Sequence, residues 1–173
     1  LKTHQLQFIH KLGSFWLLNA EAGVNTNTSQ SNSYANRNYQ LDNYTVNPKI
    51  SYLHNKNTRL EVFYTYKDKE NKINDGETLQ MHIFGSNFQY ANKERFAINA
   101  NANLYFNEFN GNTNSPVAYQ MLEGLQPGTN LTWLLGLQKR LTSFLDLNLN
   151  YIGRKSEEAK TIHTGNVQLR ATF

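Results

Sequence analysis

The amino-acid sequence predicts an all-β fold, an antiparallel transmembrane β-barrel of about nine or ten strands, and three observations support this. Apolar and polar residues alternate over segments of about 10 to 14 residues, as in strands that separate two unlike environments. Short and long polar connections alternate between these segments. The longest wholly apolar runs, such as 15–18, are far shorter than the roughly 20 residues of a transmembrane helix.

The first two strands are expected to form a hairpin. In 3–12 the large apolar side chains fall mainly on one face, and Gly13 and Ser14 then provide residues for a tight reversal. The returning strand, 14–25, alternates again, with Trp, Leu, Ala and Val on one face. A long loop rich in Asn, Ser and Thr follows it.

The next hairpin joins 40–54 to 58–68 through a short turn at 55–57. Pro48 cannot donate to a strand ladder, so we expect a bulge or a locally unpaired position there. The charged loop at 68–77 is rich in oxygen ligands, but it lacks the regular ligand spacing of a Ca²⁺ loop. A solvated polar loop is therefore expected.

The third hairpin is expected to join 78–91 to 95–108. Apolar residues of 78–91 change faces along the segment, which suggests a bulge near Gly85. In 95–108 apolar residues alternate with a row of amides, Asn99, Asn101, Asn103 and Asn107. Such a row cannot form the core of a soluble protein without dense hydrogen bonding, so it is expected to face water.

A long loop follows, in which we expect a short helical turn near 117–122. The last three strands are expected at 129–140, 144–154 and 161–173, each with Leu, Val or aromatic residues on one face and polar residues on the other.

Strict alternation of short and long connections is typical of outer-membrane barrels, which have short periplasmic turns and long extracellular loops. A soluble, adhesin-like β-sandwich that acts as a binding module is the alternative for a chain with seven to nine or so strands. A sandwich would not make almost every strand apolar on one face with Asn and Gln on the other.

The alternation assigns side chains to environments. The residues expected to line the lumen are Glu21, Asn47, Lys49, Glu61, Asn99, Asn101, Asn103, Asp146, Asn148, Asn150, Gln168 and Arg170. The residues of the last strand expected to face lipid are Val167, Leu169, Ala171 and Phe173. The cations expected to meet lipid head groups near the outer rim are Lys67, Lys69, Arg154 and Lys155.

Aromatic residues are expected to gather where the bilayer meets water. Those near the expected outer ends of the strands are Tyr44, Tyr66, Phe106, Trp133 and Tyr151. Those near the expected inner ends are Tyr52, Tyr90, Phe96, Phe144 and Phe173.

Nine strands would leave one edge of the sheet unpaired, whereas bacterial single-chain barrels have even strand numbers. We therefore expect these strands to be the C-terminal part of a larger barrel, closed by upstream strands of the same polypeptide or by another chain. A tenth strand within 117–122 would instead permit closure.

Composition excludes several kinds of chemistry. The chain has no Cys, its net charge of +4 comes from scattered Lys and Arg, and its five His residues lack metal-ligand spacing. We expect no nucleic-acid partner, no cofactor, no metal site and no catalytic residues. The alternative is an outer-membrane hydrolase that uses Glu157, Glu158 and His163 at the outer rim.

Three segments carry a family resemblance: "GLQPGTNLTW" at 124–133, "LNYIGRKSE" at 149–157 and "IHTGNVQLRATF" at 162–173. In these the chain resembles the C-terminal barrel segments of large outer-membrane proteins of Bacteroidota, particularly flavobacteria. The resemblance implies an outer-membrane location, contact with outer-membrane lipid and lipopolysaccharide, and a Phe173-terminated strand read by the barrel-assembly machinery. It leaves transporter, translocon and surface-protein anchor open as functions.

Overall fold

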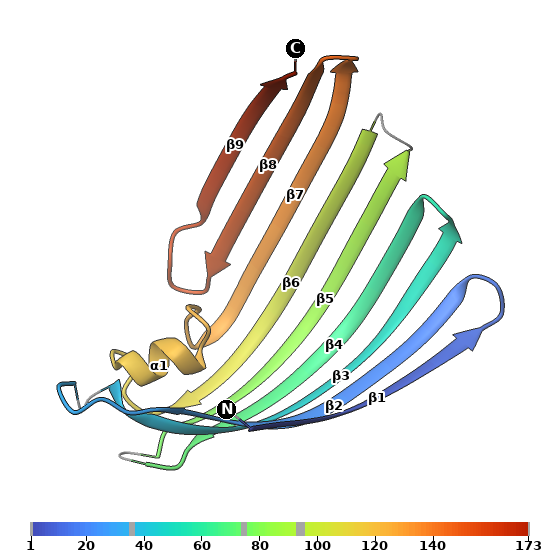
Figure 1. The fold of residues 1–173 in the computed structure, drawn as a ribbon. Coiled ribbons are helices and arrows are strands. Elements are labelled where there is room, and N and C mark those ends of the chain that lie inside the picture. Colours follow the sequence, from blue (N-terminus) through green and yellow to red (C-terminus); the bar gives the residue numbers. More distant parts are fainter. Residues whose placement is uncertain (1, 35–36, 74–75, 93–95, 173) are drawn as a thin grey trace.

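The computed structural model describes residues 2–34, 37–73, 76–92 and 96–172. Within them, nine antiparallel strands form one sheet in which each strand pairs with its neighbours in sequence (Figure 1). The elements are β1 (Lys2–Leu12), β2 (Trp16–Ser29), β3 (Tyr39–Asn55), β4 (Thr58–Asn71), β5 (Thr78–Asn92), β6 (Phe96–Asn110), α1 (Pro116–Met121), β7 (Gly128–Thr142), β8 (Leu145–Ser156) and β9 (Ile162–Ala171). The predicted all-β antiparallel fold is confirmed.

The connections give the sheet two unlike ends. Turns of two or three residues follow β1, β3 and β7, and these strand ends form the short-turn end of the sheet. Longer connections follow β2, β4, β6 and β8 at the opposite, long-loop end, where α1 also lies (Figure 1). No helix of the described residues is long and apolar enough to cross a membrane.

Two strands continue further toward the long-loop end than the sequence suggests. β2 runs to Ser29 rather than 25, and β4 runs to Asn71 rather than 68. Polar residues here resemble a loop in composition but form regular pairs with β3, and the Thr26 hydroxyl donates to Asp42 Oδ1 at 2.7 Å. Polarity therefore misplaces the strand ends because both faces are polar at this level.

The 117–122 segment is helical and does not supply a tenth strand. Ser115 caps α1, because its side-chain oxygen accepts from the Ala118 N–H at 2.9 Å, and Pro116 occupies the first turn. Three residues of α1, Val117, Ala118 and Met121, are buried.

The two irregularities expected within strands have different outcomes. Pairing between β3 and β4 lapses at Asn47 and Pro48 without a change of register, as expected for a residue that cannot donate. The bulge expected near Gly85 is wrong, because β5 pairs in continuous register with both neighbours. Gly85 instead leaves room for the Phe63 ring, which a Cβ at this position would overlap.

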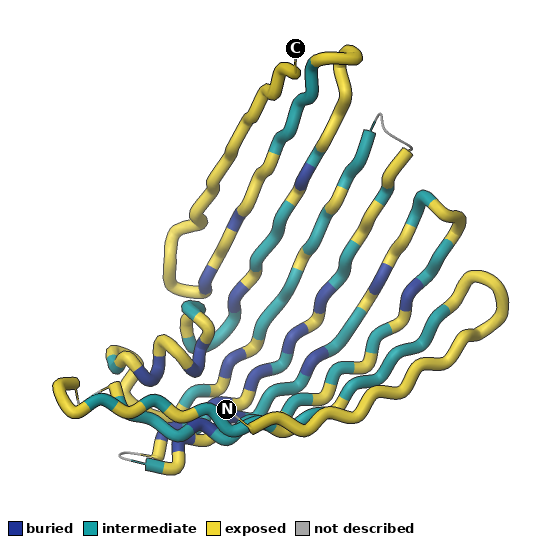
Figure 2. Tube along the Cα trace, in the orientation of Figure 1, coloured by how far each residue is buried: buried dark blue, intermediate teal, exposed yellow. Residues whose placement is uncertain are grey.

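Apart from one apolar cluster beneath α1, burial in this sheet is the reverse of that in a soluble protein. On the face that carries Ser51, Asn71 and Asn130, these polar side chains are at most 1% exposed. On the other face large apolar residues of the interior strands are open, with Val62 50% and Phe84 52% exposed, so buried and exposed positions alternate along part of β5 (Figure 2). Side chains crowd together inside a curved sheet and separate outside it, so the polar face is the inner face and the apolar face the outer face.

A small apolar core lies on the inner face at the long-loop end. Its buried members are Leu41, Leu79, Met81, Ile83, Val117, Ala118, Met121 and Leu122. These residues come from β3, β5 and the α1 segment, so the core holds α1 against the wall.

The two outermost strands each have one partner. β1 pairs with β2 and β9 pairs with β8, and no other described strand lies beside them. All described residues of both strands are exposed.

Candidate functional site

The strand register places all twelve residues expected to line the lumen on the inner face. Glu21 stands opposite Asn47, which shares its face with Lys49, and the same face continues through Glu61, Asn101 and beyond. On β8 and β9 the members are Asp146, Asn148, Asn150, Gln168 and Arg170. The polar positions of neighbouring strands thus lie opposite one another, so they share one face across the sheet.

Glu61 is the centre of a hydrogen-bonded row on this face. Its carboxylate accepts from Arg59 Nη2 at 2.8 Å, Asn87 Nδ2 at 2.9 Å and the Ser51 hydroxyl at 3.0 Å. The row continues on β6, where Asn101 donates to Asn87 and Asn103 donates to Asn101. Other amide oxygens of the inner face are buried without a partner among the described residues, namely those of Asn19, Asn43, Asn47, Asn103 and Asn107. Such oxygens are normally satisfied by water or by a bound polar molecule.

Charge is unevenly divided between the two faces. The cations of the described strands on the inner face are Lys11, Lys49, Arg59, Lys67, Lys69, Arg140, Arg154 and Arg170. The carboxylates on that face are Glu21, Glu61 and Asp146. The outer face has Lys2, Lys139 and Lys155 against Asp42, Asp68, Glu70 and Glu108. The inner face is therefore strongly cationic.

A carboxylate from the α1 segment reaches the inner face at the long-loop end. Glu123 Oε1 lies 2.6 Å from Lys67 Nζ and 2.7 Å from Lys69 Nζ. Lys69 is buried and also donates to the carbonyl oxygen of Met121 at 2.7 Å. Burial alone would raise the pKa of Glu123, but Lys69 and Lys67 outweigh it and hold that pKa below its ordinary value.

The backbone at Glu123 adopts a conformation that normally belongs to glycine. Its φ is 57°, which makes it the one non-glycine residue with positive φ among the described residues. The next residue, Gly124, has a φ of 77° and ends the helical segment in the same left-handed region. Glycine would adopt this conformation without strain, whereas the Cβ of Glu123 makes it unfavourable.

Polar contacts with three further strands hold the rest of this segment. Gln126 exchanges two hydrogen bonds with Asn130 of β7, at 2.7 and 3.2 Å, and accepts another from Asn107 of β6 at 2.9 Å. Arg154 of β8 donates to the Gly124 carbonyl oxygen at 3.1 Å. We call residues 116–126 the inner loop, since they lie folded against the inner face.

The lipid head-group expectation is wrong for three of its four cations. Lys67, Lys69 and Arg154 lie on the inner face and bind the inner loop. Lys155 lies on the outer face and donates to the Ala159 carbonyl oxygen at 2.8 Å. The error arises because a position near the rim does not decide which face a side chain occupies, whereas odd and even spacing does.

The last strand has the expected division of faces. Val167, Leu169 and Ala171 pair with Leu149, Leu147 and Leu145 on the outer face. Phe173 lies outside the described residues.

Two residues of the hydrolase alternative, Glu157 and His163, make hydrogen bonds with residues outside that set. Glu157 accepts from the Thr129 N–H at 3.0 Å, while His163 lies on the outer face with its Nδ1 2.7 Å from the Tyr151 hydroxyl. No group of three or more metal-ligating side chains occurs within the described ranges.

Sequence reasoning missed the pairing of the outer-face histidines with tyrosines. His82 Nδ1 lies 2.7 Å from the Tyr64 hydroxyl, and His54 Nδ1 lies 3.1 Å from the Tyr52 hydroxyl. The His54 pair lies within one strand at a spacing of two residues, so the sequence contained that signal.

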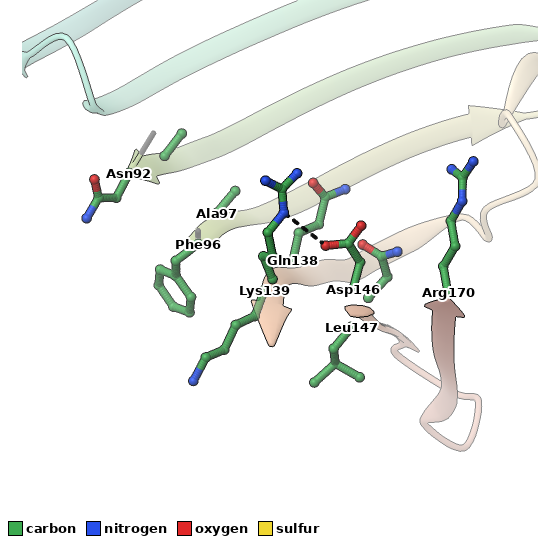
Figure 3. A pocket seen from close by; sticks show the side chains of 11 residues that line it. Asn92, Phe96, Ala97, Gln138, Lys139, Asp146, Leu147 and Arg170 are labelled. Carbon is green, nitrogen blue, oxygen red and sulfur yellow. Dashed lines mark hydrogen bonds and ion pairs between the residues drawn. The ribbon is translucent and has the colours of Figure 1, made fainter. Parts of the chain in front are cut away.

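A hollow of about 440 Å³ lies at the short-turn end and includes charged residues of the inner face (Figure 3). Arg140 Nε lies 3.4 Å from Asp146 Oδ1, and Asp146 stands opposite Arg170 in the β8–β9 register. Cations therefore occur at both ends of the inner face.

Comparisons with known proteins were made on the sequence and on the structure. No family model and no curated protein match the chain. Among solved structures, the chain resembles OmpT, an outer membrane protein of Vibrio cholerae folded in vitro, with a TM-score of 0.62 and 11% identity over 89% of this chain and 45% of that one. For the trimer form of OmpT the TM-score is 0.63 with 12% identity, over 98% of this chain and 55% of that one.

The NanC porin aligns with a TM-score of 0.49 and 11% identity, over 99% of this chain and 93% of that one. The chain spans about half the length of the OmpT chains it resembles. OmpT is described as an outer membrane protein, in agreement with the expected outer-membrane location. None of these matches concerns Bacteroidota. The chain has the fold of an outer-membrane β-barrel wall.

Proposed function

We propose that the chain forms part of the wall of a bacterial outer-membrane β-barrel whose inner face lines an aqueous passage for polar solutes, with a preference for anions. The observation that carries the proposal is the burial pattern of the interior strands, in which amides of the inner face are enclosed and large apolar residues of the outer face are open. In water such an outer face would be a large aggregation-prone patch, whereas acyl chains would cover it without penalty. Contact with outer-membrane lipid and lipopolysaccharide follows from this placement.

Closure of the wall requires more strands than the nine described. The edges of β1 and β9 leave backbone N–H and C=O groups without partners, and in lipid each such group costs several kcal/mol. Further strands of the same polypeptide or a second chain would pair with them, and the barrel-assembly machinery would insert the product. The intact mass of the native membrane polypeptide, compared with 20.0 kDa, distinguishes these two sources of strands.

The charge of the inner face favours transport over a purely anchoring role. On the inner face the strands contribute eight cations, and the carboxylates are three from the strands and Glu123 from the inner loop, so cations are in excess. A passage lined with one sign of charge concentrates the opposite ion, because low-dielectric walls focus the field. Anionic solutes should therefore enter more readily than cations of the same size.

Single-channel recording tests this proposal. The complete native polypeptide would be reconstituted in a planar bilayer, and its reversal potential measured across a KCl gradient. We expect selectivity for chloride, reduced by Lys49→Gln and unchanged by Lys139→Gln, which removes the same charge from the outer face. Absence of conductance, or selectivity for potassium, would contradict the proposed passage or its anion preference.

A further inference from the structure

The contact between Glu123 and two lysines resembles an occupied ligand site. One carboxylate oxygen lies within 2.7 Å of both Lys67 Nζ and Lys69 Nζ. Carboxylate oxygens and ammonium groups form short, charge-assisted hydrogen bonds of this kind with bound ligands as well as within proteins. The two cations come from alternate positions of β4 and point from the same face.

The wall beside this contact is built for a polar molecule. A hollow of about 230 Å³ adjoins the ion pairs and is open to the inner face. Its lining includes Asn25, Asn43 and Thr45 in addition to the two lysines. The Asn43 amide donates to Asn25, which fixes the orientation of its side chain. Amides and a hydroxyl group therefore surround the cations, and they can hydrogen-bond the uncharged part of a small ligand.

The backbone of Glu123 gives a reason why its carboxylate can be displaced. Its left-handed conformation is disfavoured for a residue with a Cβ, so the ion pairs act against local strain at Glu123. A ligand that supplies another carboxylate to Lys67 and Lys69 would satisfy the cations and let Glu123 leave this conformation. The strain thus weakens the internal carboxylate as a competitor.

We propose that Lys67 and Lys69 form a binding site for a small carboxylate, that Glu123 occupies this site in the unliganded protein, and that the ligand displaces Glu123 and loosens the inner loop. This deepens the proposed function and rests on it, since the ligand would reach the site through the aqueous passage. It names the class of anion that the passage is built to recognise.

Cysteine labelling tests the displacement directly, because these 173 residues contain no Cys and any Cys in the remaining strands would be replaced by Ser. Ala118 and Leu122 are buried against the wall, at 0% and 2% exposure, whereas Tyr119 on the same helix is 70% exposed. Ala118→Cys would be prepared in the complete native polypeptide in lipid vesicles permeable to the reagent, and its reaction rate with a small maleimide measured. The probe is sodium propionate, compared with sodium chloride at the same ionic strength.

We expect propionate to raise the labelling rate of Ala118→Cys at least fivefold over chloride and to leave the rate of Tyr119→Cys unchanged. Adding Glu123→Gln to Ala118→Cys should give rapid labelling in both salts, because the competing carboxylate is gone. Equal rates for Ala118→Cys in propionate and chloride would overturn the proposal. Leu122→Cys supplies the same measurement if Ala118→Cys does not fold.

The labelling result and the conductance result can fail separately. A wall that does not conduct can still release its inner loop to propionate, which would support the site but not the passage. An anion-selective passage whose labelling ignores propionate would retain the proposed function and reject the carboxylate site.

Discussion

Glu123 offers the sharpest test of how the inner loop is held, because its backbone conformation destabilises the loop while its side chain stabilises it. Its left-handed φ of 57° disfavours any residue with a Cβ by about 1 kcal/mol. Its carboxylate binds Lys67 and Lys69, and the Glu123 side chain is 41% exposed in these pairs. Screening at that exposure limits each pair to about 0.5 to 1 kcal/mol.

The two contributions predict an order for two substitutions. Glu123→Gln keeps the strained backbone and removes the charge, so the inner loop should lose about 1 to 2 kcal/mol. Glu123→Gly removes the same charge but relieves the backbone, so the loss should be smaller by about 1 kcal/mol. Since about 1.4 kcal/mol is a factor of ten, loop opening should rise roughly tenfold in the glutamine variant and less than about fivefold in the glycine variant.

Hydrogen exchange measured by mass spectrometry follows this opening. In the inner loop the Leu122 N–H donates to Ala118 at 2.9 Å, and the Gly124 N–H donates to Tyr119 at 3.1 Å. Exchange in the peptide that covers 116–126 should increase in the order wild type, glycine, glutamine, while peptides from β6 and β7 remain unchanged. Exchange in the glutamine variant equal to that of the wild type would refute the ion-pair argument. Faster exchange in the glycine variant than in the glutamine variant would refute the strain argument.

Further predictions concern pH, close packing and the two faces. The pKa of Glu123 is lowered, so its ion pairs stabilise the inner loop fully above the ordinary carboxyl pKa of 4.5. This stabilisation is lost as the pH falls through the depressed pKa. Hydrogen exchange in 116–126 should rise there in the wild type but not in Glu123→Gln. Gly85→Ala should lower the urea midpoint for refolding into lipid vesicles, because the added Cβ overlaps Phe63, and combination with Phe63→Ala should recover part of it; no recovery would contradict that clash. Leu149→Arg should destabilise the wall by about 2 to 4 kcal/mol at the bilayer midplane and Asn150→Arg by much less, measured by the same titration; equal losses would reject the assignment of faces.

The sequence predicts the sheet well because the bilayer imposes a two-residue period on every strand. Polar and apolar positions retain their faces through continuous registers such as Asn87 with Asn101 and Gln138 with Asn148. Strand ends are harder to predict, since residues such as Thr26 and Asn27 lie beyond the level at which one face is apolar. There the pattern disappears although the backbone ladder continues.

The site could be predicted in its composition but not in its contacts. Alternation alone places Lys67 and Lys69 on the polar face, yet it cannot show that Glu123 reaches them across more than 50 positions in sequence. Left-handed φ at a glutamate has no sequence signature, because glycine or asparagine would be expected at such a position. The position of the inner loop depends on long-range packing, which local patterns do not contain.

The amide row that ends at Glu61 also has an electrical direction. Asn103 donates to Asn101, Asn101 to Asn87, and Asn87 to the Glu61 carboxylate, so three side-chain dipoles point the same way across β4, β5 and β6. Aligned dipoles polarise one another, and the negative charge at Glu61 is thereby partly transmitted to the carbonyl oxygen of Asn103, which is buried without a partner. The wall thus contains a fixed dipole that runs from a neutral amide to a charge, and Asn103 Oδ1 is a strengthened acceptor enclosed within the packed inner face.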